Sequence, residues 1–87
     1  MTYKLILKPS AEKQFSKLPK AVQKRLYKAF GKLTEEPRLA GAIKLQDASG
    51  YYRLRVGDYR IVYHIQDQEL TILILVIDHR RQVYRSL

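Results

Sequence analysis

Hydrophobic and polar residues alternate along two neighbouring runs in the middle of the chain, residues 51–56 and 59–65. Strict alternation is typical of a β-strand that buries one face and exposes the other. Gly57-Asp58 lies between the two runs. A two-residue turn that contains glycine and joins two alternating runs predicts a β-hairpin. We therefore expect residues 51–65 to form an antiparallel hairpin around which the rest of the domain is organised.

The register of this hairpin separates its side chains into an apolar face and a basic face. With Gly57-Asp58 as the loop, Arg55 lies opposite Arg60, and residues two apart share a face. The apolar face carries Tyr52, Leu54, Val56, Tyr59, Ile61 and Tyr63. The basic face carries Tyr51, Arg53, Arg55, Arg60, Val62 and His64. Two arginines directly opposite each other repel, so the pattern favours an anionic partner on this face. Ordinary solvent-facing strand residues are the alternative.

Two amphipathic helices are predicted before the hairpin. Ser10 is expected to cap the first, which runs to Leu18 with apolar residues at i, i+4 and i+7. Pro19 suits the first turn of the second helix, which ends at residues 35–37. The apolar stripe of this second helix consists of Val22, Leu26, Ala29, Phe30 and Leu33. Its opposite side is lined by Lys20, Lys24, Lys28 and Lys32. The two segments should form a helix hairpin.

Further strands are predicted at residues 3–8, 43–45 and 70–77. The last is apolar on both faces, as expected of a central strand. A two-residue loop at Asp67-Gln68 would place Arg60 opposite Leu75 and bring His79 to the basic face, although a one-residue bulge would reverse this. The sequence thus predicts one domain, residues 1–87, of the α+β class. A helix hairpin packs on a small, mainly antiparallel sheet in the order β-α-α-β-β-β.

Composition narrows the function classes. Seventeen Lys and Arg residues against eight Asp and Glu give a net charge of +9, which favours nucleic acid or an acidic protein as partner. The absence of cysteine excludes disulfides and thiolate metal sites. His64 and His79 stand without a nearby carboxylate cluster, so we expect neither metal nor cofactor. The apolar run at 72–77 is too short for a membrane span. A cytoplasmic protein is expected.

Clustered arginines suit phosphate chemistry that uses organic groups alone, because the planar guanidinium binds phosphate oxygens in two places. RNA supplies its own nucleophile, the 2′-hydroxyl, so cleavage needs a base, an acid and cations around the phosphate. The candidate cations are Arg53, Arg55, Arg60 and Arg80, and the candidate proton carriers are His79 and Tyr84. Further RNA-binding candidates are Tyr51, Arg81, Lys20 and Lys24. The alternatives are that Tyr84 anchors the C-terminus by packing and that Tyr51 covers the sheet edge.

The segments YRLRVGDYRIVY (52–63) and HRRQVY (79–84) resemble the RelE branch of the RelE/ParE toxin superfamily. The resemblance implies a toxin of a type II toxin–antitoxin pair that enters the ribosomal A site and cuts mRNA. It also implies an acidic, RelB-like antitoxin that inhibits the toxin, and operator DNA that is bound only through the antitoxin complex.

Carried over by position, Arg53 and Arg55 fall where the best-studied members of the RelE branch have catalytic lysines. Arg60, Arg80 and Tyr84 match residues of the two motifs. Because the pKa of arginine exceeds about 12, it is a poor proton donor. Proton transfer is therefore expected at Tyr84 and His79, with the arginines stabilising charge.

Two other functions share the predicted fold. A ParE-like toxin would inhibit DNA gyrase by binding it, without chemistry of its own. A pure binding module would act only with its antitoxin as a repressor complex, and its lysines and arginines would serve docking alone. The endoribonuclease is favoured because a protein that only binds gyrase does not need the basic and aromatic residues Arg53, Arg55, Arg60, Arg80 and Tyr84.

Overall fold

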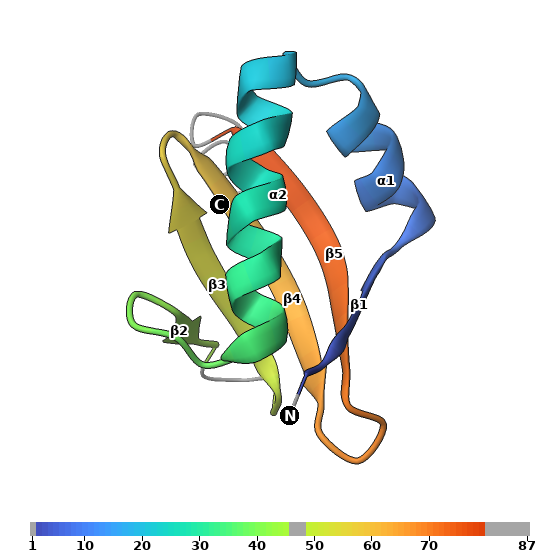
Figure 1. The fold of residues 1–87 in the computed structure, drawn as a ribbon, viewed down its shortest axis with the longest axis vertical. Coiled ribbons are helices and arrows are strands. Elements are labelled where there is room, and N and C mark those ends of the chain that lie inside the picture. Colours follow the sequence, from blue (N-terminus) through green and yellow to red (C-terminus); the bar gives the residue numbers. More distant parts are fainter. Residues whose placement is uncertain (1, 46–48, 80–87) are drawn as a thin grey trace.

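Two helices pack across one face of a five-stranded sheet (Figure 1). The structure is a computed structural model and describes residues 2–45 and 49–79. In chain order the elements are β1 (Lys4–Leu7), α1 (Pro9–Ser16), α2 (Lys20–Glu35), β2 (Ile43–Lys44), β3 (Tyr51–Val56), β4 (Tyr59–Gln66) and β5 (Thr71–His79). The strand order is β1-β5-β4-β3-β2, and β1 alone runs parallel to its neighbour. This is the α+β architecture that the sequence predicts.

The helix hairpin forms as expected, but its ends differ from the prediction: α1 ends at Ser16 and not at Leu18, and Pro19 is the N-cap residue just before the first turn of α2. Pro9, and not Ser10, occupies the first position of α1, and the preceding residue provides no side-chain cap. Proline is favoured there because its fixed φ suits the first turn and its missing N–H has no intrahelical partner. The two helices are joined by Gln23, whose Nε2 donates to the carbonyls of Phe15 at 3.0 Å and Leu18 at 3.1 Å. These bonds satisfy carbonyl groups at the end of α1.

The core lies between α2 and the centre of the sheet. The stripe predicted on α2 supplies it, since Leu26, Phe30 and Leu33 are buried. The sheet contributes the buried side chains of Leu54, Ile61, Tyr63, Ile65, Ile72, Ile74 and Ile77. Both helices cover the same face of the sheet (Figure 1). The side chains of the opposite face, including the arginines of β3 and β4, are not covered by either helix.

The central hairpin has the predicted register. Arg55 pairs with Arg60 and Leu54 with Ile61. Gly57 has a φ of 61°, a left-handed conformation that glycine adopts without steric cost. Glycine at the first of two turn residues is the arrangement of a type II′ hairpin turn, whose twist matches that of the strands.

The second hairpin corrects the prediction for His79. Its loop has four residues, 67–70, so Arg60 pairs with Asp78 and not with Leu75. The register also shifts between Val62 and Tyr63. His79 pairs with Tyr59 and therefore lies on the helix-covered face, opposite to the arginines. The predicted position of His79 on the basic face is wrong.

The core explains this bulge. Ile74 and Ile77 are both buried, although they are three residues apart and a regular strand alternates with a period of two. An extra residue in β5 brings both isoleucines to the same face. Because Ile77 is buried, Asp78 lies on the face of the arginines and His79 lies on the helix-covered face.

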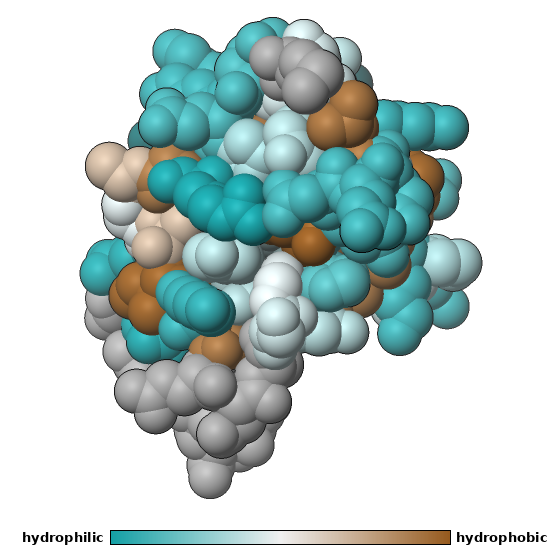
Figure 2. Space-filling model, turned by 90° about the horizontal axis from the view of Figure 1, so that it is seen from below, coloured by the Kyte–Doolittle hydropathy of each residue, from teal (hydrophilic) through white to brown (hydrophobic). Residues whose placement is uncertain are grey.

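A polar network closes the end of the molecule that carries the β4–β5 turn. Arg38 forms a two-pronged ion pair with Asp67, with Nη2 at 2.8 Å from Oδ2, and its Nε donates to the Tyr52 hydroxyl at 3.1 Å. Tyr3 donates to Asp67 at 2.7 Å. Hydrogen bonds from Arg38 and Tyr3 hold the pKa of Asp67 below its usual value. Hydrophilic residues cover most of this end (Figure 2).

Beneath this network, the buried Tyr63 hydroxyl donates to the Pro37 carbonyl at 2.8 Å. The bond ties β4 to the segment that follows α2. Burial raises the pKa of Tyr63 to about 12. Among the helices of the described ranges, none is long and apolar enough to cross a membrane.

Candidate nucleic-acid interface

Three arginines from the central hairpin gather in one hollow. Arg53 and Arg55 of β3 and Arg60 of β4 line a cavity of about 240 Å³, together with Gly41, Ile43 and Leu54. Arg55 is exposed and the other two arginines are half-buried. The alternation that placed them on one face is therefore confirmed, and the three arginines surround a single hollow. Such a space suits an anion with several oxygens.

The orientation of Arg55 is set by the neighbouring turn. Its Nε donates to the carbonyl oxygen of Gly57 at 2.8 Å. This bond uses Nε and does not use the two Nη groups, which form the fork that binds phosphate oxygens. The turn therefore acts as a support that holds one guanidinium group at the rim of the hollow.

Asp78 lies across the sheet from the paired arginines. Arg60 pairs with Arg55 on one side and with Asp78 on the other. Opposite charges directly across a strand pair are favourable, whereas like charges are not. Asp78 is not expected here from the sequence, because the predicted two-residue loop places Leu75 at its position. The row across the sheet thus carries two cations and one carboxylate.

An aromatic pair lies at the other end of the same face. Tyr51 pairs with His64 across the strands, and their rings stack with centroids 4.3 Å apart at an angle of 27°. Gly50, with a φ of 81°, makes room for this stack, because a Cβ there would lie 2.9 Å from His64 Nε2. Tyr51 and His64 thus present aromatic surface along the face that carries the arginines.

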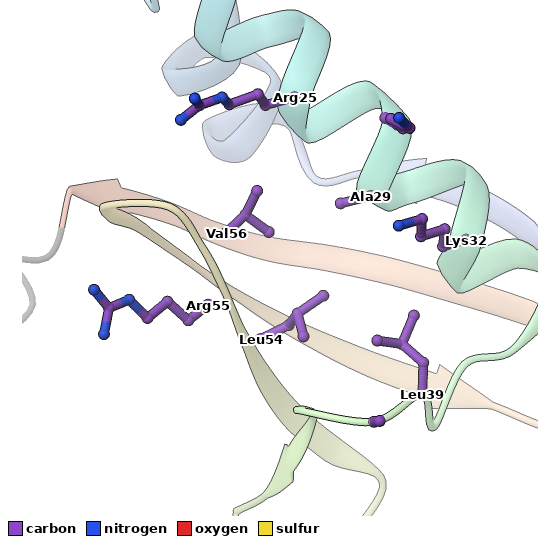
Figure 3. A pocket seen from close by; sticks show the side chains of 9 residues that line it. Arg25, Ala29, Lys32, Leu39, Leu54, Arg55 and Val56 are labelled. Atoms are coloured by element: carbon purple, nitrogen blue, oxygen red, sulfur yellow. The ribbon is translucent and has the colours of Figure 1, made fainter.

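A second hollow lies on the other side of β3, beneath α2. It measures about 320 Å³, and Arg25, Lys28 and Lys32 of α2 and Arg55 of β3 line it. Figure 3 shows Leu54 and Val56 pointing from the strand toward the helix, whereas Arg55 extends from the strand away from the helix and Arg25 extends outward from the helix. The sequence alone assigns no role to these helix cations. Their spacing at i, i+3 and i+7 is the signal that could have grouped them.

The remaining candidates lie elsewhere. Lys20 and Lys24 line another hollow of about 500 Å³ between the helices, with Phe15, Tyr27 and Lys28, and Lys28 also lines the hollow beneath α2. The ring of His79 contacts Tyr59 edge-on, with centroids 5.2 Å apart. Arg80, Arg81 and Tyr84 lie outside the described residues. Within residues 2–45 and 49–79, no group of three His, Asp or Glu side chains could hold a metal ion.

Known proteins share this sequence and fold. The model of the family described as the ParE toxin of the type II toxin–antitoxin system parDE matches residues 5–84. The toxin RelG of Mycobacterium tuberculosis is 34% identical over 86 residues, which cover 98% of this chain and 99% of RelG. The mRNA interferase toxin RelE of Escherichia coli is 30% identical over 84 residues, with 94% and 87% covered.

Solved structures agree with the sequence comparison. The archaeal RelE–RelB complex from Pyrococcus horikoshii superimposes with a TM-score of 0.82 at 32% identity, covering 92% of this chain and 97% of the other. The RelBE2 toxin–antitoxin complex of M. tuberculosis gives a TM-score of 0.79 at 33% identity, covering 92% and 100%. The chain therefore belongs to the RelE/ParE superfamily of type II toxin–antitoxin toxins, on its RelE-like branch.

Proposed function

We propose that this chain is a ribosome-dependent, metal-independent endoribonuclease that cuts mRNA in the ribosomal A site. The observation that carries the proposal is the gathering of Arg53, Arg55 and Arg60 in one hollow. Relatives that bear the name mRNA interferase support the same chemistry. A toxin that only binds its target has no need of three convergent guanidinium groups.

The arginines act on the phosphate as charge develops. A base takes the proton of the 2′-hydroxyl, and its oxygen attacks the adjacent phosphorus. The bond from phosphorus to the 5′-oxygen breaks, and an acid protonates this leaving oxygen. The products are a 2′,3′-cyclic phosphate and a 5′-hydroxyl. Guanidinium groups already in place bind the phosphate oxygens more strongly in the transition state, where their negative charge is greatest.

Proton transfer requires groups other than the arginines, whose pKa values exceed about 12. We assign this role to Tyr84 and His79, with Arg80 adding positive charge. His79 lies at the end of β5 on the helix-covered face, so Tyr84 is the first candidate for contact with the reacting atoms. A free tyrosine has a pKa of about 10, and neighbouring arginines favour its charged form.

Binding of RNA beyond the cleaved phosphate falls to the other cations and aromatic rings. Tyr51, stacked on His64, offers a surface for a base, since every base has a π-face. Arg81 is assigned to the same strand of RNA. Lys20 and Lys24 line a different hollow, so we assign them to RNA outside the cleaved stretch. Such dispersed contacts suit a substrate that the ribosome positions.

An acidic, RelB-like antitoxin is the proposed partner that neutralises the toxin. Several superimposable structures are RelE–RelB complexes. The net charge of +9 on this chain would attract an acidic protein, making association fast and sensitive to salt. Operator DNA would be bound only through the antitoxin complex.

The test is cleavage of an mRNA on purified ribosomes. Arg60→Ala and Tyr84→Phe should each slow single-turnover cleavage by about 10²-fold or more, the usual contribution of one charge-stabilising or proton-transferring group. Lys17→Gln, which removes an exposed charge directly after α1 and outside the lining of the arginine hollow, should keep the wild-type rate. Wild-type rates in both Arg60→Ala and Tyr84→Phe would refute the assignment.

Two further measurements separate the remaining functions. Cleavage should persist in EDTA and should nearly disappear when ribosomes are omitted. Induced expression should shorten cellular mRNA within codons. A DNA-damage response with intact mRNA would instead indicate a ParE-like gyrase inhibitor.

A further inference from the structure

We propose that the cleft between α2 and β3 binds the mRNA nucleotide next to the cleaved phosphodiester. The inference rests on the proposed endoribonuclease function and adds a second subsite to it. The cleft measures about 320 Å³, which lies at the small end of the roughly 300–1,000 Å³ of ligand sites. It is therefore large enough for a single small group and too small for a packed helix.

The lining of the cleft matches the two parts of a nucleotide. Arg25, Lys28 and Lys32 form one wall, and among the described residues none that lines the cavity is acidic. Its floor is apolar and consists of Ala29, Leu39, Leu54 and Val56. A base can lie on the apolar floor while its phosphate meets the cationic wall. This division of apolar and charged contacts is the pattern of sites that bind single-stranded nucleic acid.

The cleft is continuous with the arginine hollow because β3 has a free edge between them. β2 pairs only with Arg53 and Tyr52 of β3. In the part of the chain that the structure describes, residues 54–56 therefore have a strand partner on one side only. Leu54 and Arg55 line both hollows. An RNA strand held by Arg53 and Arg60 can thus pass around this edge beside Arg55 and reach the cleft.

The Gly57 turn aligns the two guanidinium groups at the mouth of the cleft. Arg55 donates to the Gly57 carbonyl, and a Cβ at Gly57 would lie 3.3 Å from Nη1 of Arg25. Arg25 and Arg55 thus both meet the same turn, one from the helix and one from the strand (Figure 3). Two cations on either side of one opening suit the phosphate that links the nucleotide in the cleft to the cleaved one.

An acidic segment of an antitoxin is the rival occupant. The cleft could accept a carboxylate on the same lysines. RNA is favoured because the cleft shares Arg55 with the hollow proposed to hold the cleaved phosphate, so one ligand can occupy both. The experiment must therefore measure RNA and antitoxin separately.

The test uses the salt dependence of RNA binding. A fluorescent single-stranded oligoribonucleotide with one deoxyribose at the cleaved position is titrated with toxin at several salt concentrations. Each phosphate contact on a single strand contributes about 0.7 to the slope of log K against log salt. Lys28→Gln and Lys32→Gln should each lower the slope by about 0.7, and the double variant by about 1.4. Lys17→Gln, with the same change of charge directly after α1, should leave the slope unchanged.

A crosslinking experiment on the ribosome identifies which toxin residues contact the mRNA. The mRNA carries 4-thiouridine next to the cleaved position, and the crosslinked peptide is identified by mass spectrometry. We expect residues 25–32 or 54–56. Unchanged slopes in both lysine variants, an equal loss in Lys17→Gln, or crosslinks confined to other segments would overturn the proposal. The proposal would also be overturned if the lysine variants bound an acidic antitoxin peptide more weakly but bound RNA as the wild type does.

The failure of this subsite is distinguishable from failure of the proposed function. If wild-type toxin cuts mRNA on ribosomes and Lys28→Gln and Lys32→Gln behave like Lys17→Gln, the subsite alone is refuted. If wild-type toxin cuts no mRNA on ribosomes, the endoribonuclease itself is refuted. Thermal melting of every variant checks that each is folded.

Discussion

Replacing Tyr63 with phenylalanine removes one buried hydrogen bond and leaves the ring. Tyr63 is fully buried, and its hydroxyl donates to the Pro37 carbonyl at 2.8 Å. The phenylalanine ring keeps the stacking with Tyr52, whose centroid lies 5.9 Å away. The variant loses the bond and leaves a buried carbonyl without its donor, which together cost about 2 kcal/mol of unfolding free energy. For a domain of this size the melting temperature should fall by about 8–16 °C.

Urea unfolding measures this cost directly. The midpoint should fall while the dependence on urea stays the same, because Tyr63→Phe does not change the surface exposed on unfolding. Tyr27→Phe is the matched control, since Tyr27 is 75% exposed and its change should stay within about 0.5 kcal/mol. If Tyr63→Phe also stays within about 0.5 kcal/mol, the hydroxyl does not fasten the segment after α2 to the sheet.

Alkaline pH gives a second readout of the same bond. Burial raises the pKa of Tyr63 from 10.0 to about 12, so the native state keeps the phenolic proton over a range where the unfolded chain loses it. The stability that Tyr63 contributes is complete below pH 10 and is lost as pH rises toward 12. The phenylalanine variant lacks this loss, so the gap between wild type and variant should narrow across that range. A constant gap would contradict the burial of an ionisable hydroxyl.

Three further outcomes are expected. Gly50→Ala should lower the unfolding free energy by at least about 1 kcal/mol through its left-handed φ alone. The new methyl group also contacts His64 Nε2, and adding His64→Ala should remove the cost of that contact. A double-mutant cycle by urea unfolding would report this as a coupling between the two positions. Asp67→Asn should reduce the loss of stability that acid titration shows below pH 4. The pKa of Asp67 is lowered in the folded protein, so its contribution to stability is present above the unfolded pKa of 3.8 and is lost as pH falls. The same loss of stability at low pH in the variant would contradict the hydrogen bonds to Asp67. Arg53→Lys should keep the cleavage rate on ribosomes within about ten-fold of wild type, whereas Arg53→Ala should lower it by about 10²-fold, since both Lys and Arg stabilise phosphate charge. Equal losses of rate in the two variants would indicate that the guanidinium fork is needed.

The central hairpin could be predicted from sequence because one glycine turn fixes its register. Alternation over β3 and β4 then determines which side each arginine takes, and the structure confirms it. The second hairpin could not be predicted in the same way. Residues 70–77 are apolar on both faces, so periodicity does not fix a register, and the four-residue loop carries no strong turn signal. The bulge that moves His79 follows from the burial of Ile77, which depends on the complete core.

The cleft beneath α2 also lay beyond sequence reasoning. The spacing of Arg25, Lys28 and Lys32 alone predicts that they share one face of the helix, but it does not predict which part of the sheet that face meets. That partner is the unpaired edge of β3, which exists because β2 has only two residues. The length of β2 had a weak signal, since residues 38–50 combine two glycines with the loop-like run Asp47-Ala48-Ser49. A loop conformation thus decides whether the helix cations are solvated or line a cavity.

The pairing of β1 with β5 determines when the fold can be completed during synthesis. Lys4 pairs with Thr71 and Leu7 with Ile74, so the first strand finds its neighbour only after more than sixty intervening residues have been made. Contacts this distant in sequence form late, because the loop between them must close first. A nascent chain emerging N-terminus first therefore cannot assemble the sheet while β5 is still inside the exit tunnel. For a protein proposed to attack translating ribosomes, this delay would protect the ribosome that is making it.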